Sequence, residues 1–472
     1  MSEAINTELP EGWESVPLKN AVHVILGQSP KSSTYNEEGE GLPFFQGKTE
    51  FGEIYPTVRK WCTEPKKIAE AEDILVSVRA PVGPTNLAPY KCAIGRGLAA
   101  IRPLGGNDPK YFLYLVRRHQ ESLAALGTGT TFGAISGDTL KNFVVPVAPI
   151  AQQERIVAKI EELFSHIDAG IKALKKAKQL LKQYRQSVLK AAVTGELTKE
   201  WREANKDKLE PTSQLLERIL KERRQKWEEQ QLEQFKAKGK MPKNDKWKVK
   251  YSEPTQDIEK FFYEPDGWAW TEIGTITDML SGHAFKKAEY TKSGVRLFQI
   301  ANVSFGYAKW DEVEYLPESY LEEWKYLKLE AGDVLMALNR PLLSKQLKIA
   351  RLGKSDVPSI LYQRVGKFQF YSDIISDYFL LYMQSPYYIN RLEEQLQGVN
   401  IPFINKGKLL ETPISIPSSE EELRLIVGEA NKRLDGIARL ETEIDEQMKK
   451  SERNKQSVLV SAFSGNLKET EV

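Results

Sequence analysis

Two long stretches of the chain carry apolar residues at alternating steps of four and three, which is the spacing of a heptad repeat. The first stretch begins after Pro149 and the second after Pro417. A helix over 151–192 would span on the order of 60 Å at a rise of about 1.5 Å per residue. We therefore expect two long helices with apolar seams, formed by Ile156, Ile160, Leu163, Ile167, Gly170, Leu174, Ala177, Leu181, Tyr184, Val188 and Ala191 in the first and by Val427, Ala430, Leu434, Ile437, Ile444, Met448, Val458 and Ala462 in the second.

The second seam is interrupted by Glu441, Ser451 and Lys455. Polar residues at seam positions weaken the apolar contact between paired helices. We therefore expect the second helix to depend on the first. The two are predicted to pack as an antiparallel coiled coil about an approximate twofold axis.

The ends of the two predicted helices are almost the same sequence. Residues 186–197 read QSVLKAAVTGEL and residues 456–467 read QSVLVSAFSGNL, and each run ends at a glycine, a common helix stop. Upstream, Pro10-Glu-Gly-Trp13 matches Pro265-Asp-Gly-Trp268. The offset rises only from 265 − 10 = 255 to 456 − 186 = 270, so the order of elements is shared. The chain therefore contains one large unit twice.

The stretches before each long helix have a different pattern. Short apolar runs such as 21–26, 74–78 and 98–101 lie between Gly, Pro and Asn clusters, which favours strands and turns, and 109–126 has helical spacing. This mixture predicts an α+β fold. The chain is expected to divide into α+β domains at 1–147 and 263–416, helical spacers at 148–197 and 417–472, and a charged linker at 198–262.

The charged linker alternates in sign and is punctuated by proline and glycine. We expect an exposed helix at about 212–236. The linker also carries four large aromatic residues, Trp201, Trp227, Phe235 and Trp247. They would either dock onto the long helices or a partner, or pack on the following domain.

Composition narrows the class of protein. The 472 residues include 67 Lys plus Arg and 65 Asp plus Glu, so any basic surface must be local. The two cysteines form no CxxC pair and the four histidines form no metal-spaced cluster, which argues against a zinc site and fits a reducing compartment. No apolar run reaches about 18 residues and the amino terminus is polar, so we expect neither a membrane span nor a signal peptide, and a cytoplasmic location.

Two glycine-rich stretches resemble nucleotide-binding motifs but fail their spacing. Residues 41–49 have five residues between the glycines where a phosphate-binding loop has four, with a proline inside the turn. Residues 127–133 lack the GxGxxG spacing and are predicted to be a flexible polar loop.

Polar side chains gather in the predicted loops of both α+β parts. Each could be an ordinary solvated side chain, yet Gln, Asn and Arg can also form bidentate hydrogen bonds to base edges while Lys and Ser hold phosphates. The candidates are Gln28, Lys31, Ser32, Tyr35, Gln46, Lys48, Arg79 and Arg96 in the first part and Lys286, Lys287, Tyr290, Gln299, Asn302, Asn339, Arg340, Lys345, Gln363 and Arg364 in the second.

The layout resembles the specificity subunit of type I restriction-modification systems. The resemblance rests on the PEGW and PDGW openings, on residues 146–157, on the doubled QSVL endings and on residues 195–201, and it covers essentially the whole chain. The second copy departs from the pattern at 418–426, where SSEEELRLI replaces a QQERI run.

This resemblance implies a noncatalytic DNA-reading scaffold. Each α+β part would be a target-recognition domain for one half of a split, asymmetric sequence in double-stranded DNA. The paired helices would bind two methyltransferase subunits, to which restriction and translocase subunits add. AdoMet, ATP and Mg²⁺ would bind to those partners and not to this chain.

A coiled-coil scaffold carrying two protein-binding modules is the alternative. It predicts no sequence-selective DNA protection when the methyltransferase partner is supplied. The DNA sequence itself does not follow from the chain, because a loop side chain does not reveal which base it faces.

Overall fold

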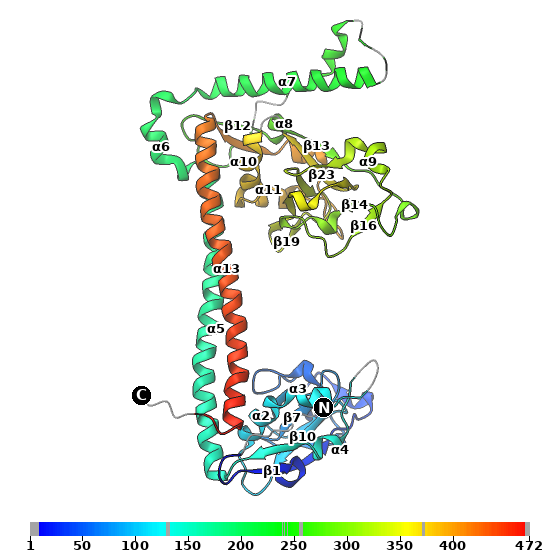
Figure 1. Ribbon diagram of the computed structural model, residues 1–472, viewed down its shortest axis with the longest axis vertical. Coiled ribbons are helices and arrows are strands. Elements are labelled where there is room, and N and C mark those ends of the chain that lie inside the picture. The colour runs from blue at the N-terminus through cyan, green and yellow to red at the C-terminus, as the bar shows by residue number, and fades with distance from the viewer. Residues whose placement is uncertain are drawn as a thin grey trace. The chain divides into compact units, whose positions relative to one another are not determined.

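The chain divides into two units, each assembled from segments that are distant in sequence. Unit 1 comprises Met1–Ala177 and Thr442–Val472, and unit 2 comprises Lys178–Glu441. Residues 129–132 of the predicted polar loop lie outside the described residues. The computed structural model describes residues 9–128, 133–237, 239, 241–242, 244–253, 258–370 and 373–467 (Figure 1).

The domain of unit 1 is built on two sheets and a two-stranded ribbon. The ribbon pairs β1 with β11, the larger sheet has the order β3-β5-β4-β9-β6, and the other has the order β2-β10-β7-β8. These strands are β1 (Glu14–Pro17), β2 (Val22–Leu26), β3 (Tyr35–Asn36), β4 (Leu42–Phe45), β5 (Trp61–Cys62), β6 (Ile68–Ala69), β7 (Ile74–Ser77), β8 (Thr85–Leu87), β9 (Cys92–Ile94), β10 (Leu98–Pro103) and β11 (Val144–Val147).

Four short helices complete this domain: α1 (Leu18–Ala21), α2 (Pro109–Arg118), α3 (Gln120–Ala125) and α4 (Gly137–Lys141). Helix α2 starts where the Asp108 carboxylate accepts hydrogen bonds from two backbone N–H groups and a proline occupies the first turn. Its residues 111–116 are all buried, and the Tyr111 hydroxyl donates to Pro146 O at 3.2 Å. Helix α2 therefore forms the centre of the core of unit 1.

The domain of unit 2 repeats the same plan with additional strands. The strand order β13-β23-β18 corresponds to β2-β10-β7 of the first domain, and the parallel pair β14-β22 corresponds to the parallel pair β4-β9. The strands are β12 (Trp268–Glu272), β13 (Thr277–Ser281), β14 (Val295–Phe298), β15 (Phe305–Gly306), β16 (Glu314–Leu316), β17 (Lys328–Leu329), β18 (Val334–Ala337), β19 (Leu342–Leu343), β20 (Gln346–Leu347), β21 (Ile349–Arg351), β22 (Ser359–Leu361), β23 (Val365–Phe370) and β24 (Pro413–Pro417).

The helices of this second domain are α8 (Ile273–Ile276), α9 (Tyr320–Glu323), α10 (Asp373–Met383), α11 (Pro386–Gln395) and α12 (Lys406–Leu410). The predicted α+β class and the duplication are confirmed in both units.

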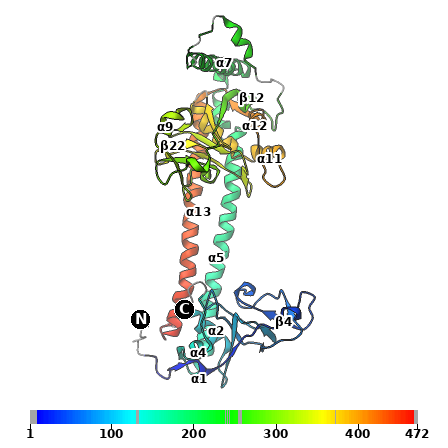
Figure 2. The ribbon, with the colours of Figure 1, turned by 90° about the vertical axis from the view of Figure 1, so that its right-hand side faces the viewer.

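The predicted long helices are α5 (Ile150–Val193) and α13 (Glu420–Phe463), each of 44 residues. In unit 2, Arg185 pairs with Glu441 at 3.4 Å, and Thr198, just beyond α5, donates to Glu422 at 2.7 Å. Because the partner number falls as the position along the first helix rises, the helices run antiparallel there. In unit 1 the first part of α5 likewise packs beside the last part of α13 (Figures 1 and 2). The predicted twofold axis would relate the two units and stays a prediction.

The seam of the helix pair differs from the predicted one in α5. Gly170 is exposed and Tyr184 is 48% exposed, whereas Ile171 is buried and Arg185 is half-buried. The two predicted positions were wrong because the neighbouring residue turns inward instead. The following predicted seam residues are buried or half-buried: Ile156, Ile160, Leu163, Ile167, Leu174, Leu181 and Val188 in α5 and Leu434, Ile437, Ile444, Met448 and Val458 in α13.

Two of the three polar interruptions of the second seam, Glu441 and Lys455, pair with residues of the first helix. In unit 1, Lys455 Nζ lies 2.5 Å from Asp168 and 5.3 Å from the ring centre of Phe164. In unit 2, Glu441 takes the pairing with Arg185. These residues are therefore polar links between the helices, with the charged ends half-exposed.

Each domain is tied to a long helix by the tryptophan of its opening motif. Trp13 Nε1 donates to Gln152 at 2.9 Å, and Trp268 Nε1 donates to Glu422 at 3.1 Å. The acceptors occupy equivalent places, since 422 − 152 = 270. The departure of the second copy at 418–426 therefore replaces a neutral acceptor by a carboxylate.

The linker forms α6 (Lys199–Ala204) and α7 (Thr212–Ala237), close to the predicted helix. Arg223 of α7 donates to Gly274 O at 3.0 Å, so α7 packs on the second domain. Trp227 stacks on Trp247 with 5.8 Å between ring centres. Phe235 also contacts Trp247, with 6.0 Å between ring centres. These three aromatic residues therefore pack on one another within the linker, which neither predicted alternative describes. In the described part of the chain, none of the helices has the length and apolar character that a membrane crossing needs.

Candidate functional site

In unit 1, backbone hydrogen bonds hold four loops together at one end of the strands. The N–H of Gln28, after β2, donates to Ile94 O of β9 at 3.1 Å. The N–H of Gly95 donates to Phe45 O of β4 at 2.8 Å. These bonds place the loop after β2 and the loop after β4 beside the β9–β10 connection.

The fourth loop, after β7, joins through Val78, whose N–H donates to Gly97 O at 2.9 Å. The loop after β4 and the β9–β10 connection lie so close together that position 97 requires glycine, because a Cβ on Gly97 would lie 2.2 Å from the carbonyl oxygen of Gln46. Four exposed polar side chains, which we call loop cluster 1, therefore come together: Gln28, Gln46, Arg79 and Arg96.

Unit 2 repeats the same three hydrogen bonds. His283 N–H donates to Leu361 O at 3.4 Å, and Tyr362 N–H donates to Phe298 O at 3.1 Å. The loop after β18 again joins through a bond to the β22–β23 connection, from Leu338 N–H to Arg364 O at 2.9 Å. Matching bond to bond gives loop cluster 2, in which His283, Gln299, Asn339 and Gln363 stand where Gln28, Gln46, Arg79 and Arg96 stand in cluster 1.

His283 was not among the sequence candidates. Its imidazole is exposed and stacks on Trp324, with 4.4 Å between ring centres. A signal for it existed, because 283 − 28 = 255 is the offset of the opening motifs.

Arg340 and Arg364 adjoin cluster 2 on unusual backbone. Both are exposed, with φ of 46° and 67°. Non-glycine residues rarely adopt this region, so the surrounding structure holds these two arginines in place. Arg340 N–H donates to Pro402 O at 2.6 Å, which secures the first of them.

Some candidates brace the loops from inside. The Tyr35 hydroxyl donates to Pro30 O at 2.8 Å, and the Gln299 side-chain amide donates to the Tyr290 hydroxyl at 3.2 Å. Burial raises the pKa of Tyr290 to about 12, so its hydroxyl stays protonated at neutral pH. These rings position their loops.

Asn302 is buried, with 1% of its surface exposed. Its side-chain oxygen accepts from Gln299 N–H at 2.8 Å, and its amide donates to Lys309 O and Glu312 O. A side chain whose hydrogen bonds are used inside the fold cannot also contact a base. Asn302 is therefore not expected to contact a base.

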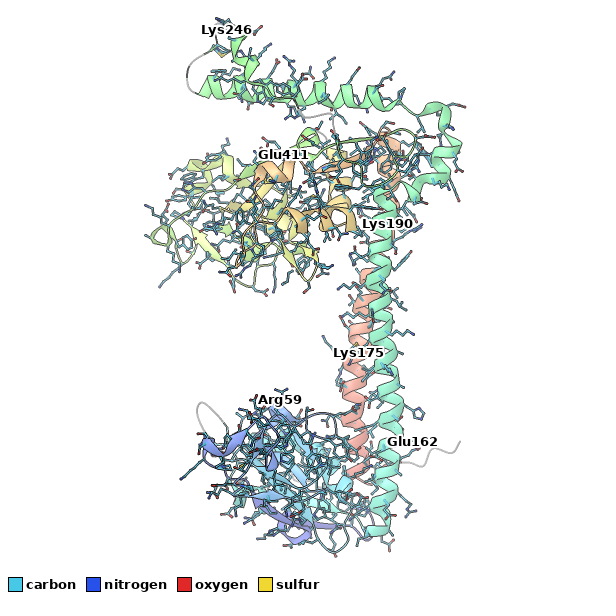
Figure 3. All side chains as sticks on the ribbon, turned by 180° about the vertical axis from the view of Figure 1, so that it is seen from behind. Arg59, Glu162, Lys175, Lys190, Lys246 and Glu411 are labelled. Atoms are coloured by element: carbon cyan, nitrogen blue, oxygen red, sulfur yellow. The ribbon has the colours of Figure 1, made fainter. Side chains whose placement is uncertain are left out.

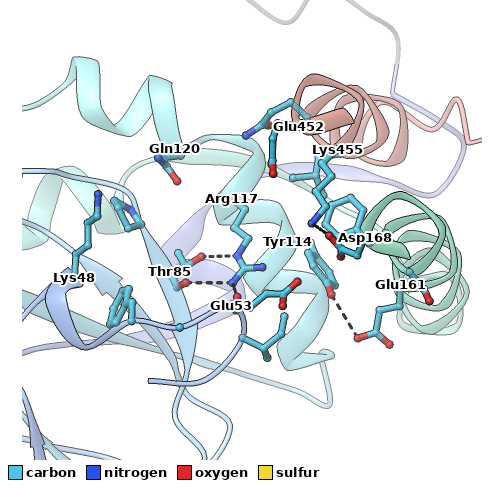
Figure 4. A pocket seen from close by; sticks show the side chains of 18 residues that line it. Lys48, Glu53, Thr85, Tyr114, Arg117, Gln120, Glu161, Asp168, Glu452 and Lys455 are labelled. Atoms are coloured by element: carbon cyan, nitrogen blue, oxygen red, sulfur yellow. Dashed lines mark hydrogen bonds and ion pairs between the residues drawn. The ribbon is translucent and has the colours of Figure 1, made fainter. Parts of the chain in front are cut away.

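The remaining lysines and serine lie in exposed loops outside the two clusters: Lys31, Ser32, Lys48, Lys286, Lys287 and Lys345. Lys48 lines a pocket of about 700 Å³ between the domain of unit 1 and its helices (Figure 4). There Arg117 donates to Thr85 at 3.1 Å and Tyr114 to Glu161 at 3.4 Å. These hydrogen bonds indicate that the residues lining the pocket serve the packing of unit 1.

All four side chains of cluster 1 are exposed, whereas in cluster 2 His283 and Gln363 are exposed and Gln299 and Asn339 are half-buried. Within the described residues, no group of three or more His, Cys, Asp or Glu is arranged to hold a metal ion. Cys92 is buried, and burial raises its pKa to about 12. The thiol is therefore protonated, and thiolate chemistry is not expected from it.

The chain is similar to several known proteins. A family model described as type I restriction modification DNA specificity domain matches residues 10–179 and 265–450. The type I restriction enzyme EcoAI specificity subunit of Escherichia coli is 27% identical over 478 residues, covering 89% of this chain and 77% of that protein.

Other matches cover less of the chain or show only the fold. The type I restriction enzyme MjaVIII specificity subunit of Methanocaldococcus jannaschii is 35% identical over 198 residues, covering 42% of this chain and 46% of that protein. This chain thus matches less than half the length of that relative. A structure from work on complex assembly and conformational transition of the type I R-M system has 17% identity, covers 98% of this chain and all of that chain, and has a TM-score of 0.66. That likeness shows a shared fold.

Proposed function

The chain belongs to the type I restriction modification DNA specificity family, and from that premise we propose that it is the subunit that reads the DNA target of a type I restriction-modification complex. Each unit would read one half of a two-part sequence in double-stranded DNA. Loop clusters 1 and 2 would make the base contacts.

One observation carries this proposal: the same hydrogen-bonded loop frame presents different polar side chains in the two units. The pairs are Gln28 with His283, Arg79 with Asn339, and Arg96 with Gln363, while only Gln46 and Gln299 agree. A shared frame with unlike side chains is expected of two readers of unlike sequences. The two half-sites should therefore differ.

The side chains suggest which bases each unit prefers. Arginine forms bidentate hydrogen bonds to the O6 and N7 of guanine, and asparagine or glutamine does so to adenine. Arg79 and Arg96 in cluster 1 favour guanine, whereas Asn339 and Gln363 in cluster 2 favour adenine. Arg340 and Arg364 would add a guanine or phosphate contact beside cluster 2.

We further propose that this subunit is noncatalytic and acts through partners. Two methyltransferase subunits would assemble on it, and restriction and translocase subunits would add to that complex. AdoMet, ATP and Mg²⁺ would bind to those partners. The duplicated arrangement supports two like partners, since each repeat offers the same helix end and opening motif.

The test is to express the chain with the methyltransferase subunit of its own system and to map methylated sites in the host genome. The proposal expects one two-part sequence with unlike halves. A partner that methylates without sequence preference when this chain is present would contradict it and would favour the protein-binding scaffold.

A further inference from the structure

A basic groove lies in unit 2 between α5 and the β19–β20 hairpin. It has a volume of about 340 Å³ and is lined by Lys178, Lys182 and Arg185 of α5 and by Lys345 of the hairpin. Glu441 also lines it but is paired with Arg185 at 3.4 Å. The groove therefore carries an excess of positive charge.

The lysines of α5 that line the groove belong to a stretch of the helix whose charged residues are all positive. Residues 171–190 contain six lysines and one arginine and no aspartate or glutamate. In a chain whose total charges nearly cancel, such a local excess points to an anionic ligand. Lys175 and Lys190 of this run are exposed on α5 (Figure 3). They are not among the residues that line the groove.

The hairpin presents Lys345 on constrained backbone. Ser344 and Lys345 form the two-residue turn between β19 and β20, with φ of 50° and 60°. Turns of this type favour Asn-Gly because both central residues need positive φ. A serine and a lysine at these positions are unfavourable for folding alone, and such outliers occur at functional sites.

The hairpin that forms one wall of the groove is connected along the sequence to loop cluster 2. Asn339 and Arg340 lead directly into β19, and Lys348, just after β20, donates from Nζ to Ile300 O at 2.8 Å, next to Gln299. A ligand that touches cluster 2 and extends toward α5 would pass this hairpin.

We infer that the groove holds the phosphate backbone of DNA flanking the half-site read by unit 2. This inference rests on the proposed function. Lys182 and Lys345 would contact phosphates from opposite walls, and the contact would be independent of base sequence. The groove would thus join the domain that reads bases to helix α5.

The test uses the full chain assembled with its methyltransferase partner. Binding is measured by fluorescence anisotropy at several salt concentrations, on a duplex carrying the methylated sequence and on a random duplex of equal length. The groove variant is Lys182→Gln with Lys345→Gln. The matched control is Lys175→Gln with Lys190→Gln, which removes the same charge from exposed lysines outside the groove.

Each lost phosphate contact lowers the slope of log affinity against log salt by about 0.9. The groove variant should therefore lose about two units of slope and bind roughly 30-fold more weakly near 0.15 M salt, on both duplexes. The methylated sequence should not change, and the control should keep the wild-type slope.

Three results would overturn the inference: an unchanged slope in the groove variant, equal losses in the variant and the control, or loss of the methyltransferase partner in size-exclusion chromatography. The last would mark the groove as a protein contact. A failure of the proposed function would be distinct, because the wild-type complex would then show no preference for either duplex.

Discussion

Replacing Glu422 by Gln should loosen the part of unit 2 where three segments meet. The Glu422 side chain has no exposed surface, and one of its oxygens accepts from Thr198 at 2.7 Å, from Arg202 at 2.7 Å and from Trp268 at 3.1 Å. These donors come from the chain after α5, from α6 and from β12. The carboxylate therefore joins the linker, the domain and the start of α13.

The expected loss of stability follows from the burial of the Arg202–Glu422 ion pair. The side chain of Arg202 is 11% exposed, so removal of its partner leaves an almost buried cation uncompensated. Breaking a buried ion pair on one side costs about 3–5 kcal/mol. Because about 1.4 kcal/mol is a factor of ten, local opening should become at least about a hundredfold more frequent.

Hydrogen exchange measured by mass spectrometry reports local opening directly, without assuming that the whole chain unfolds at once. Peptides covering α6 and β12 should exchange at least about a hundredfold faster in Glu422→Gln. The matched control is Glu421→Gln, whose side chain is exposed. Adding Arg202→Gln should recover part of the loss, because the uncompensated charge is then removed. Exchange rates within about fivefold of wild type in Glu422→Gln would show that Glu422 does not hold these three segments together.

Three further predictions concern base choice, the helix pair and pH. Arg96→Gln introduces the residue found at the equivalent position 363 and should shift one base of a single half-site from guanine toward adenine, with about 1–3 kcal/mol of discrimination lost. Methylation mapping measures this shift, and an altered preference in both halves would contradict it. Lys455→Met should cost about 1 kcal/mol in thermal unfolding at low salt and less in 1 M salt, because its pair with Asp168 is partly exposed; equal costs at both salts would argue against an ionic contribution. His119 is buried, and burial lowers its pKa to about 4, so the neutral imidazole stabilises unit 1 fully above about pH 6.5 and this stabilisation is lost as the pH falls toward 4. The free energy of unfolding of unit 1 should therefore fall by about 2 kcal/mol between pH 7 and pH 5. His119→Leu should flatten this pH dependence in hydrogen exchange, and an unchanged pH profile in the variant would contradict the prediction.

The helix pair and the duplication were predictable because both depend on spacing along the chain. The heptad pattern identified α5 and α13, but its exact face was ambiguous where neighbouring residues compete. Ile171 follows Gly170, and Arg185 follows Tyr184, and only packing decides which side chain turns inward. The ion pair of Lys455 was visible only as a break in the pattern, since the partner on the other helix is known only from the fold.

The loop clusters were predictable in residue type but not in membership. Exposed Gln and Arg in turns are consistent with base contacts, yet Asn302 has the same chemistry and is used to close a loop internally. Hydrogen bonds such as that from Val78 to Gly97 connect residues far apart in sequence, so only the folded chain shows which loops meet. The equivalence of Gln28 and His283 could have been read from the repeat offset, and it was the missed signal.

If two like loop frames read two unlike half-sites, exchanging the side chains of one frame should change one half-site only. Methylation is mapped in genomes that express the methyltransferase partner with the wild-type chain or with a chain carrying Gln28→His, Arg79→Asn and Arg96→Gln. These are the cluster 2 residues at the equivalent positions, and Gln46 already matches Gln299. We expect a two-part sequence for the wild type and a change confined to one half for the variant. A change in both halves, or an unchanged sequence at full methylation activity, would contradict it.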